Sequence, residues 1–97
     1  MKLAIKTNLG TGESSSESSV ELDTVSPVIK DVLDIISEKF QNGRPLYDKS
    51  RNEVDAEEYS ILLNGTNMRF LPEKLLTPLS EGDEVQVYRW FELLGGG

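Results

Sequence analysis

One amphipathic helix is the feature that most restricts how this chain can fold. Apolar side chains recur at three- and four-residue spacings, the period of a helix with one apolar face: Val28, Ile29, Val32, Leu33, Ile36 and Phe40. Ser26-Pro27 predicts the helix start, because serine can cap a free amide and proline at the first helical position loses no hydrogen bond. Gly43 suits the left-handed conformation past a helix end. A partner-binding helix could show the same stripe, but a stripe of this width more often packs into a core.

A sheet is expected to cover that stripe, since one helix cannot bury its apolar face alone. Residues 2–7 alternate between polar and apolar side chains and residues 20–23 repeat the alternation, which predicts two antiparallel strands. Residues 59–63 form a third strand, closed by the turn pair Asn64-Gly65. The last strand begins at Glu84. The 97 residues suffice for one modest core, and the fold class they predict is α+β, a sheet wrapped on one main helix.

Three segments between these elements carry weaker patterns. Residues 10–19 have no apolar side chain and many turn formers, so we expect a mobile acidic loop there. Residues 46–48 and 53–54 could form two short strands around a turn. Residues 71–76 predict a short irregular or helical turn that packs its leucines inward.

The residue inventory argues against an autonomous enzyme. The chain has no Cys and no His, so the common nucleophile, general base and metal ligands are missing. A net charge of −7 disfavours nucleic acid and anionic membranes and favours partners with basic docking surfaces. Asp55, Glu57 and Glu58 could bind a metal loosely, but a solvated acidic turn explains them better. The chain shows neither a signal-peptide pattern nor an apolar run long enough to span a membrane, so we expect a soluble, cytoplasmic monomer.

The other informative feature is the end of the sequence. The strand that begins at Glu84 leads towards Gly95-Gly96-Gly97. Glycine lets a backbone lie flat in a narrow cleft at any φ, so a partner enzyme could thread Gly95 and Gly96 and use the Gly97 carboxylate as the reactive group. Terminal glycines can also be a frayed end or a linker, and the glycines alone leave that interpretation open.

Strand alternation predicts a docking surface close to this tail. Val85 and Val87 should face the helix, which leaves Tyr88 and Trp90 on the opposite face. Leu62 should point the same way from a neighbouring strand. Leu62, Tyr88 and Trp90 would then form an exposed apolar patch, and aromatic side chains contribute more than their share to interfaces. Trp90 could instead fold back onto the body or cover a sheet edge.

The second half of the chain resembles a known family. An apolar strand with Asn64-Gly65, a leucine-rich turn, the sequence Gly-Asp-Glu-Val at 82–85, a strand and a glycine end are together similar to the β-grasp sulfur carriers and ubiquitin-like modifiers. That family includes the molybdopterin synthase small subunit, the small archaeal modifier proteins and the thiamine sulfur carrier. The resemblance implies a β-grasp (ubiquitin-like) roll, with a mixed sheet of four to five strands wrapped on one main helix. Residues 1–92 would form this domain and residues 93–97 a flexible glycine-rich tail.

The resemblance also implies a mechanism that needs no catalytic side chain in this chain. An adenylating enzyme similar to the ubiquitin-activating enzymes would use ATP and magnesium to activate the Gly97 carboxylate, so the chain itself would need no cofactor. The activated end would become a thiocarboxylate for sulfur transfer, in molybdopterin synthesis or tRNA thiolation, or would be joined to target lysines by isopeptide bonds. The partners would be that enzyme and either a sulfur-acceptor enzyme or target proteins. The alternative is a non-covalent ubiquitin-fold binding module with an incidental glycine end.

Overall fold

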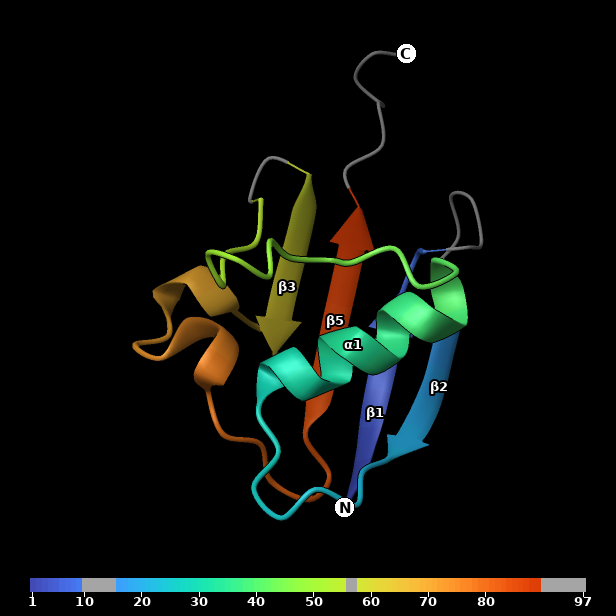
Figure 1. The fold of residues 1–97 in the computed structure, drawn as a ribbon. Helices are drawn as coiled ribbons and strands as arrows, with labels where there is room; N and C mark the ends of the chain where they lie inside the picture. The colour runs from blue at the N-terminus through green and yellow to red at the C-terminus, as the bar shows by residue number, and fades with distance from the viewer. Residues whose placement is uncertain (10–15, 56–57, 90–97) are drawn as a thin grey trace.

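A computed structural model of the chain describes residues 1–9, 16–55 and 58–89. Its elements follow in the order β1 (Lys2–Thr7), β2 (Ser16–Glu21), α1 (Ile29–Phe40), β3 (Tyr59–Leu63), β4 (Thr66–Asn67), two 3₁₀-helices at Met68–Phe70 and Lys74–Leu76, and β5 (Glu84–Arg89). α1 lies across one face of the sheet, and the N-terminus and the end of β5 lie at opposite ends of the molecule (Figure 1).

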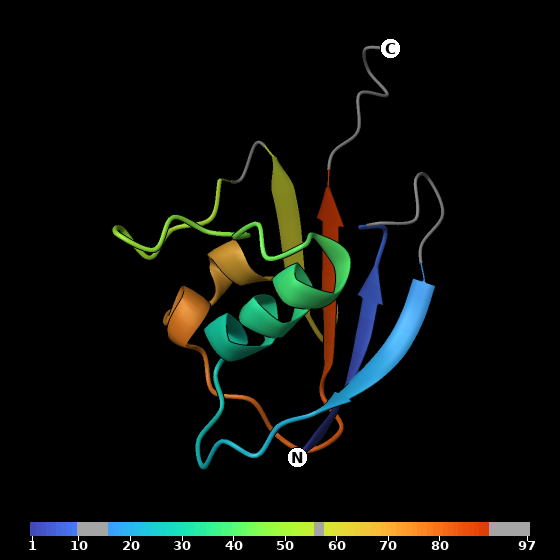
Figure 2. The same ribbon diagram turned by 45° about the vertical axis from the view of Figure 1, so that its right-hand side comes forward.

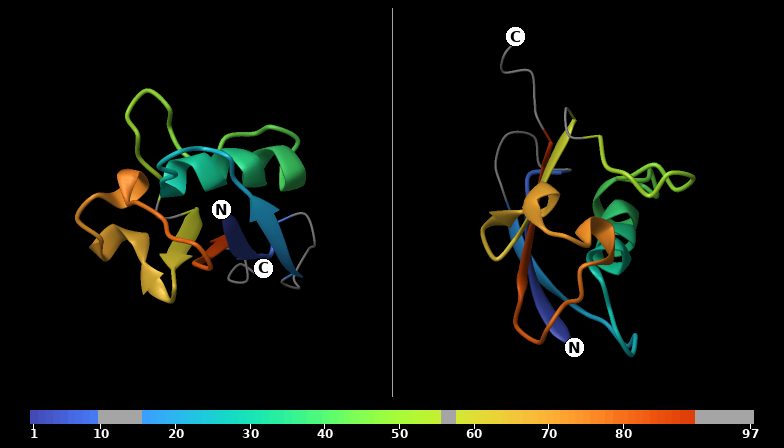
Figure 3. Two further views of the ribbon diagram at one scale, coloured as in Figure 1. Left: turned by 90° about the horizontal axis from the view of Figure 1, so that it is seen from below. Right: turned by 90° about the vertical axis from the view of Figure 1, so that its left-hand side faces the viewer.

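The five strands form one mixed sheet in the order β2-β1-β5-β3-β4. β1 and β5 are parallel neighbours at its centre, with residues 4–7 paired to residues 84–87. The β1–β2, β3–β4 and β3–β5 pairs are antiparallel. Viewed along the sheet, the strands form one layer and α1 the other (Figures 2 and 3). This architecture confirms the predicted α+β roll, with five strands in its mixed sheet.

α1 carries the predicted apolar stripe but starts later than the sequence suggests. Ser26 is exposed and does not cap the helix, whose first residue is Ile29. The segment before the helix is extended instead, because it pairs with a distant part of the chain: the Ile29 N–H donates to the Thr77 carbonyl (3.1 Å). At the helix start, the Asp31 carboxylate accepts from the Val28 N–H (3.0 Å), as the acidic half of a capping interaction does.

The C-terminal end of α1 follows the prediction. Gly43 has a φ of +83°, the left-handed conformation that glycine adopts without strain. Its N–H donates to the Ser37 carbonyl (2.9 Å), which satisfies one of the free carbonyls of the last turn.

The hydrophobic core lies between α1 and the sheet. The side chains of α1 that face the sheet are at most 1% exposed, namely Ile29, Val32, Leu33 and Ile36. The sheet contributes alternate residues of its strands, namely Leu3, Ile5, Val20, Tyr59, Ile61, Val85 and Val87. The stripe of α1 is therefore part of the core, and the partner-binding interpretation of the helix is excluded for this face.

β2 begins earlier than predicted. Residues 16–19, which the sequence assigns to a loop, pair with β1 in a continuous antiparallel register that places Ser18 opposite Ile5. Strand pairing uses backbone groups, which serine supplies as well as an apolar residue does. Val20, the inward-facing apolar residue of β2, is 8% exposed. The rest of the predicted loop, residues 10–15, lies outside the described residues.

The connections in the second half agree with the sequence only in part. Asn64 and Gly65 have φ values of +52° and +88° and form the predicted tight turn between β3 and β4. Residues 48 and 53 form a single antiparallel bridge in place of two short strands. Leu75 packs inward at 2% exposure, but Leu76 is 54% exposed, because successive side chains of a 3₁₀-helix point in directions about 120° apart. The prediction that these leucines all pack inward is therefore wrong.

Candidate functional site

The face of the sheet opposite α1, called the outer face below, is the first candidate surface. Val85 and Val87 of β5 are 0% exposed and face the helix, whereas Tyr88 is half-buried on the outer face. The same alternation on β3 buries Ile61 and leaves Leu62 half-buried on the outer face. Leu62 and Tyr88 therefore lie on the side of the sheet where the alternation predicts them.

The pairing of β3 with β5 brings Leu62 and Tyr88 together. Leu62 is opposite Gln86, and Ser60 is opposite Tyr88, so Leu62 and Tyr88 are diagonal neighbours within reach of long side chains. Gln86 Nε2 donates to the Tyr88 hydroxyl (3.2 Å), which orients the phenol along β5. Trp90 lies outside the described residues, and the role of all three residues in binding stays a prediction.

Charged side chains border this pair on the β1–β2 side of the outer face. Lys6 is directly opposite Glu17, and Lys6 Nζ lies 3.7 Å from Glu17 Oε2. An exposed ion pair of this kind adds little stability, but charge on an edge strand discourages pairing with strands of other molecules. The outer face thus has an apolar centre on β3 and β5 and a charged border on β1 and β2.

The end of β5, called the tail base below, is held on both flanks. The Arg89 N–H donates to Asn8 Oδ1 (2.9 Å), and Asn8 Nδ2 donates to the Arg89 carbonyl (3.2 Å). On the other flank, Arg89 is opposite Tyr59 of β3. Its guanidinium also lies 3.5 Å from the Glu58 carboxylate. The tail base is therefore joined to β1 through a side-chain amide and to β3 through the strand register and an ion pair.

Several predicted site residues follow the tail base and lie outside the described residues. These are the reactive Gly97, the threading residues Gly95 and Gly96, and the contact residue Trp90. The boundary predicted between a domain at 1–92 and a tail at 93–97 lies there too. The role of Gly97 therefore rests on the sequence.

An acidic hollow lies beside the tail base. Its lining includes Asp48, Glu53, Asp55 and Glu58, and Glu58 is also the ion-pair partner at the tail base. Hydrogen bonds from the Ser50 hydroxyl (2.7 Å) and N–H (2.9 Å) hold the pKa of the Asp48 carboxyl below its usual range. Two of these acids are paired with arginines, because the Arg51 guanidinium lies 3.4 Å from Glu53 and the Arg89 guanidinium 3.5 Å from Glu58.

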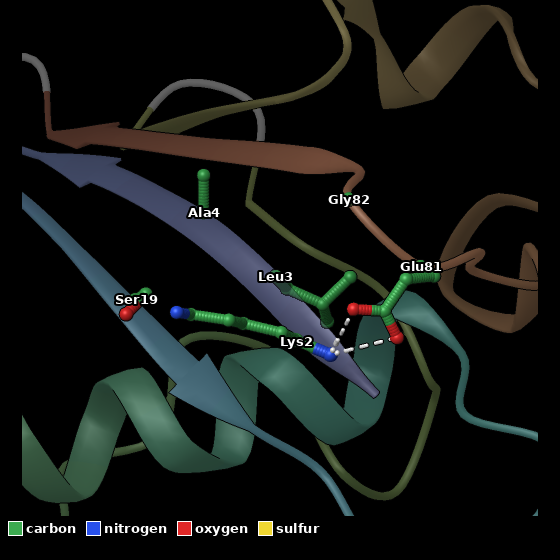
Figure 4. Close-up of a pocket in the computed structure, with 6 residues that line it drawn as sticks. All are labelled: Lys2, Leu3, Ala4, Ser19, Glu81 and Gly82. Carbon is green, nitrogen blue, oxygen red and sulfur yellow. Dashed lines mark hydrogen bonds between the residues drawn. The ribbon is translucent and has the colours of Figure 1, made fainter.

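A second hollow lies at the other end of the sheet (Figure 4). Its lining includes Lys2, Ala4, Ser19 and Glu81. Both oxygens of the Glu81 carboxylate accept from the Lys2 N–H, at 3.2 and 3.1 Å, so this carboxylate is engaged in joining the turn before β5 to β1. The hollow is next to the start of β5, whereas the tail base is at its end, and we leave it out of the candidate site.

Metal binding and membrane insertion find no support in the described parts of the chain. Within them, no group of three or more Asp, Glu, His or Cys side chains is placed to hold a metal ion. Glu57, from the acidic turn considered above, is outside these ranges. No helix in the described part of the chain is long and apolar enough to cross a membrane.

Sequence reasoning did not identify Asn8 or Phe70. Asn8 and Arg89 are 81 positions apart, and the only local signal is an amide side chain directly after a strand. Phe70 is 70% exposed, with the Arg69 guanidinium 5.0 Å from its ring centroid. Phe70 belongs to a 3₁₀-helix, and the sequence pattern predicts no regular element there. Nothing in the sequence therefore indicates that its side chain points outward.

Comparisons with known proteins agree on the fold. No protein-family model and no curated protein sequence matches the chain. The crystal structure of SAMP1 from Haloferax volcanii matches with a TM-score of 0.66 and 17% identity over 100% of both chains. The solution structure of the Haloferax volcanii HVO 2177 protein matches with a TM-score of 0.65 and 23% identity, over 100% of this chain and 87% of that one. The solution structure of the small archaeal modifier protein 1 (SAMP1) from Methanosarcina acetivorans matches with a TM-score of 0.63 and 24% identity, over 99% and 96%.

These matches, together with the strand order, define the class of fold. The chain has the ubiquitin-like β-grasp fold that its sequence resemblance implies. Two of the structures named above are of proteins called SAMP1, one of them spelled out as a small archaeal modifier protein. TM-scores of 0.63 to 0.66 at identities of 17 to 24% establish a shared fold alone, and function has to be argued from the site.

Proposed function

We propose that this chain is a ubiquitin-like modifier or sulfur-carrier protein whose reactive group is the Gly97 carboxylate. The observation that carries the proposal is that the central strand β5 ends at Arg89, only eight positions before Gly97 in the sequence. The fold is shared over nearly the full length with small archaeal modifier protein 1.

The first chemical step takes place in a partner enzyme. A carboxylate oxygen of Gly97 attacks the α-phosphorus of ATP, the bond from that phosphorus to the bridging oxygen breaks, and pyrophosphate leaves with the electron pair. The product is a mixed anhydride of Gly97 with AMP. ATP and magnesium belong to the activating enzyme, and this chain contributes the carboxylate and the contacts that dock it.

Two routes follow from the same acyl-adenylate. In a sulfur carrier, a hydrosulfide ion from the sulfur donor attacks the Gly97 carbonyl carbon, and AMP leaves with the electron pair of its bond to that carbon. Loss of the sulfur's proton gives a thiocarboxylate for delivery to a sulfur acceptor. In a modifier, a thiol of the enzyme takes the acyl group and a target lysine amine then displaces it, losing a proton and forming an isopeptide bond. Neither route uses a side chain of this chain as a catalyst, in keeping with a sequence that has no Cys and no His.

The described surface near the tail base supports a docking role. Leu62 and Tyr88 give the outer face an apolar centre on β3 and β5, and aromatic residues are over-represented among the side chains that dominate binding energies. The net charge of −7 and the acidic lining of the hollow beside the tail base favour an activating enzyme with basic residues around its entry channel. The chain acts as a monomer in the cytoplasm, where ATP is supplied.

ATP–pyrophosphate exchange with the adenylating enzyme encoded in the same genome tests the proposal. Wild-type protein should support exchange, while deletion of Gly96 and Gly97 should abolish it. Gly96→Val should do the same, because a β-branched side chain does not fit a cleft made for glycine and makes positive φ costly. Circular dichroism should show all variants folded.

Ser26→Val is a matched control, since it adds the same side chain at an exposed position before α1, away from the tail base. It should exchange like wild type. Equal exchange by wild type and both tail variants would reject Gly97 as the reactive group and favour the non-covalent binding module. Intact-mass analysis of protein from its native cell separates the two routes, because only a sulfur carrier replaces one carboxylate oxygen with sulfur.

A further inference from the structure

The pairing of β1 with β5 ends at Val87, two residues before the last residue of β5, Arg89. The parallel register runs from Ala4 opposite Glu84 to Thr7 opposite Val87. In the described part of the chain, no residue after Thr7 continues this register with β5. The end of β5 would therefore leave its backbone groups without a strand partner on this flank.

The Asn8 side chain takes the place of the missing strand. Its carbonyl oxygen accepts from the Arg89 N–H (2.9 Å), and its amide nitrogen donates to the Arg89 carbonyl (3.2 Å). A side-chain amide carries the same donor and acceptor as a peptide group, so Asn8 reproduces one rung of the sheet. Both hydrogen bonds are partly buried, which protects them from competition by water.

The opposite flank of Arg89 is held as well. β3 places Tyr59 opposite Arg89, and the Glu58 carboxylate lies 3.5 Å from the Arg89 guanidinium. This ion pair is more than a third exposed on both sides, so it is weak. The bidentate contact with Asn8 is therefore the stronger constraint on where the backbone of residue 89 lies.

We propose that Asn8 is a positioning residue: its side-chain amide fixes the backbone of Arg89 at the end of β5, so that Gly97 is presented to the activating enzyme from a defined origin. This inference rests on the proposed function. Eight residues separate this origin from the end of the sequence, and they span at most about 29 Å when fully extended. Because eight residues cover only this distance, the position and direction of the Arg89 backbone limit where Gly97 can be placed.

The chemistry of the contact predicts which substitutions break it. Asn8→Ala removes both hydrogen bonds. Asn8→Asp keeps the size and the acceptor for the Arg89 N–H but loses the donor, and it places a carboxylate oxygen against the Arg89 carbonyl. A role that needs both hydrogen bonds therefore predicts a higher KM in both variants, whereas a role in filling space affects only Asn8→Ala.

Amide hydrogen exchange and steady-state kinetics test the proposal on the full chain. The Arg89 amide should exchange at least tenfold faster in Asn8→Ala than in wild type, and should stay protected in Asn8→Asp, which keeps the acceptor, while amides of α1 change little. With the adenylating enzyme from the same genome, KM for the carrier should rise about tenfold, since fixing one further residue changes an equilibrium by about that factor. The kcat at saturation should be unchanged, because the bound tail is the same.

Ile36→Val is the matched control for a general loss of stability, since it removes one methylene from a side chain that is 1% exposed on α1. It should leave both KM and the exchange of the Arg89 amide as in wild type. An unchanged KM in Asn8→Ala, with wild type active, would overturn the positioning role and leave the proposed function intact. Absence of any pyrophosphate exchange with wild type would instead reject the proposed function, and this inference with it.

Discussion

Adjacent residues of β3 offer a sharp test of the two faces of the sheet. Ile61 is 2% exposed in the core, and Leu62 is half-buried on the outer face. Ile61→Ala and Leu62→Ala remove similar aliphatic side chains from the middle of one strand, so loss of strand propensity contributes similarly to both. The difference between the two variants therefore reports the environment of each face.

The expected magnitudes follow from the neighbours of each residue. Ile61 is opposite Val87, which is 0% exposed, and replacing a buried Ile with Ala costs about 2–5 kcal/mol, including the cavity left behind. Leu62 is opposite Gln86 and diagonal to Tyr88, and cross-strand contacts on an open face contribute roughly 0.2–1 kcal/mol each. At about 4–8 °C per kcal/mol for a domain of this size, Ile61→Ala should lower Tm by ten degrees or more and Leu62→Ala by only a few.

Urea denaturation followed by circular dichroism measures both changes, and equal m-values would show that the comparison concerns the same unfolding transition. ATP–pyrophosphate exchange with the activating enzyme measures a second quantity, the strength of docking. Leu62→Ala should weaken docking by about 1–3 kcal/mol if Leu62 belongs to the contact, and Ile61→Ala should leave docking per folded molecule unchanged. Equal losses of stability would show that Leu62 is not on an open face, and equal docking would remove it from the contact surface.

Two further perturbations test separate parts of the structure. Replacing residues 10–15 with an Asn-Gly turn should shift Tm by only a few degrees, because the free-energy cost of closing a loop changes by only about 0.6 kcal/mol for each doubling of its length. A large drop, measured by thermal denaturation, would reveal packing by those residues. Burial and a hydrogen bond donated to Asp34 (3.0 Å) raise the pKa of Tyr47 to about 12, so stability from this phenol is complete below pH 10 and is lost as pH rises from there through about 12. The difference between the ultraviolet titrations of wild type and Tyr47→Phe should show a phenol that ionises near pH 12; a difference centred near pH 10 would contradict this.

Local periodicity accounts for much of the fold. The three- and four-residue spacing of the α1 stripe places Val32, Leu33 and Ile36 in the core, because a helix repeats every 3.6 residues. Alternation along β3 and β5 places Leu62 and Tyr88 on the outer face, because a strand repeats every two. The predicted turn at Asn64-Gly65 needs only residues that tolerate positive φ. Each of these features depends on neighbours along the chain, so the sequence by itself determines them.

Contacts between distant segments decided the rest. α1 begins at Ile29 because that residue pairs with Thr77, and β2 begins at Ser16 because β1 offers a ladder of backbone partners. Residues 8 and 89 meet only after β1 and β5 have become parallel neighbours at the centre of the sheet. No periodicity reports such a meeting, since a hydrogen bond across 81 positions depends on strand order and register, which only the assembled sheet specifies.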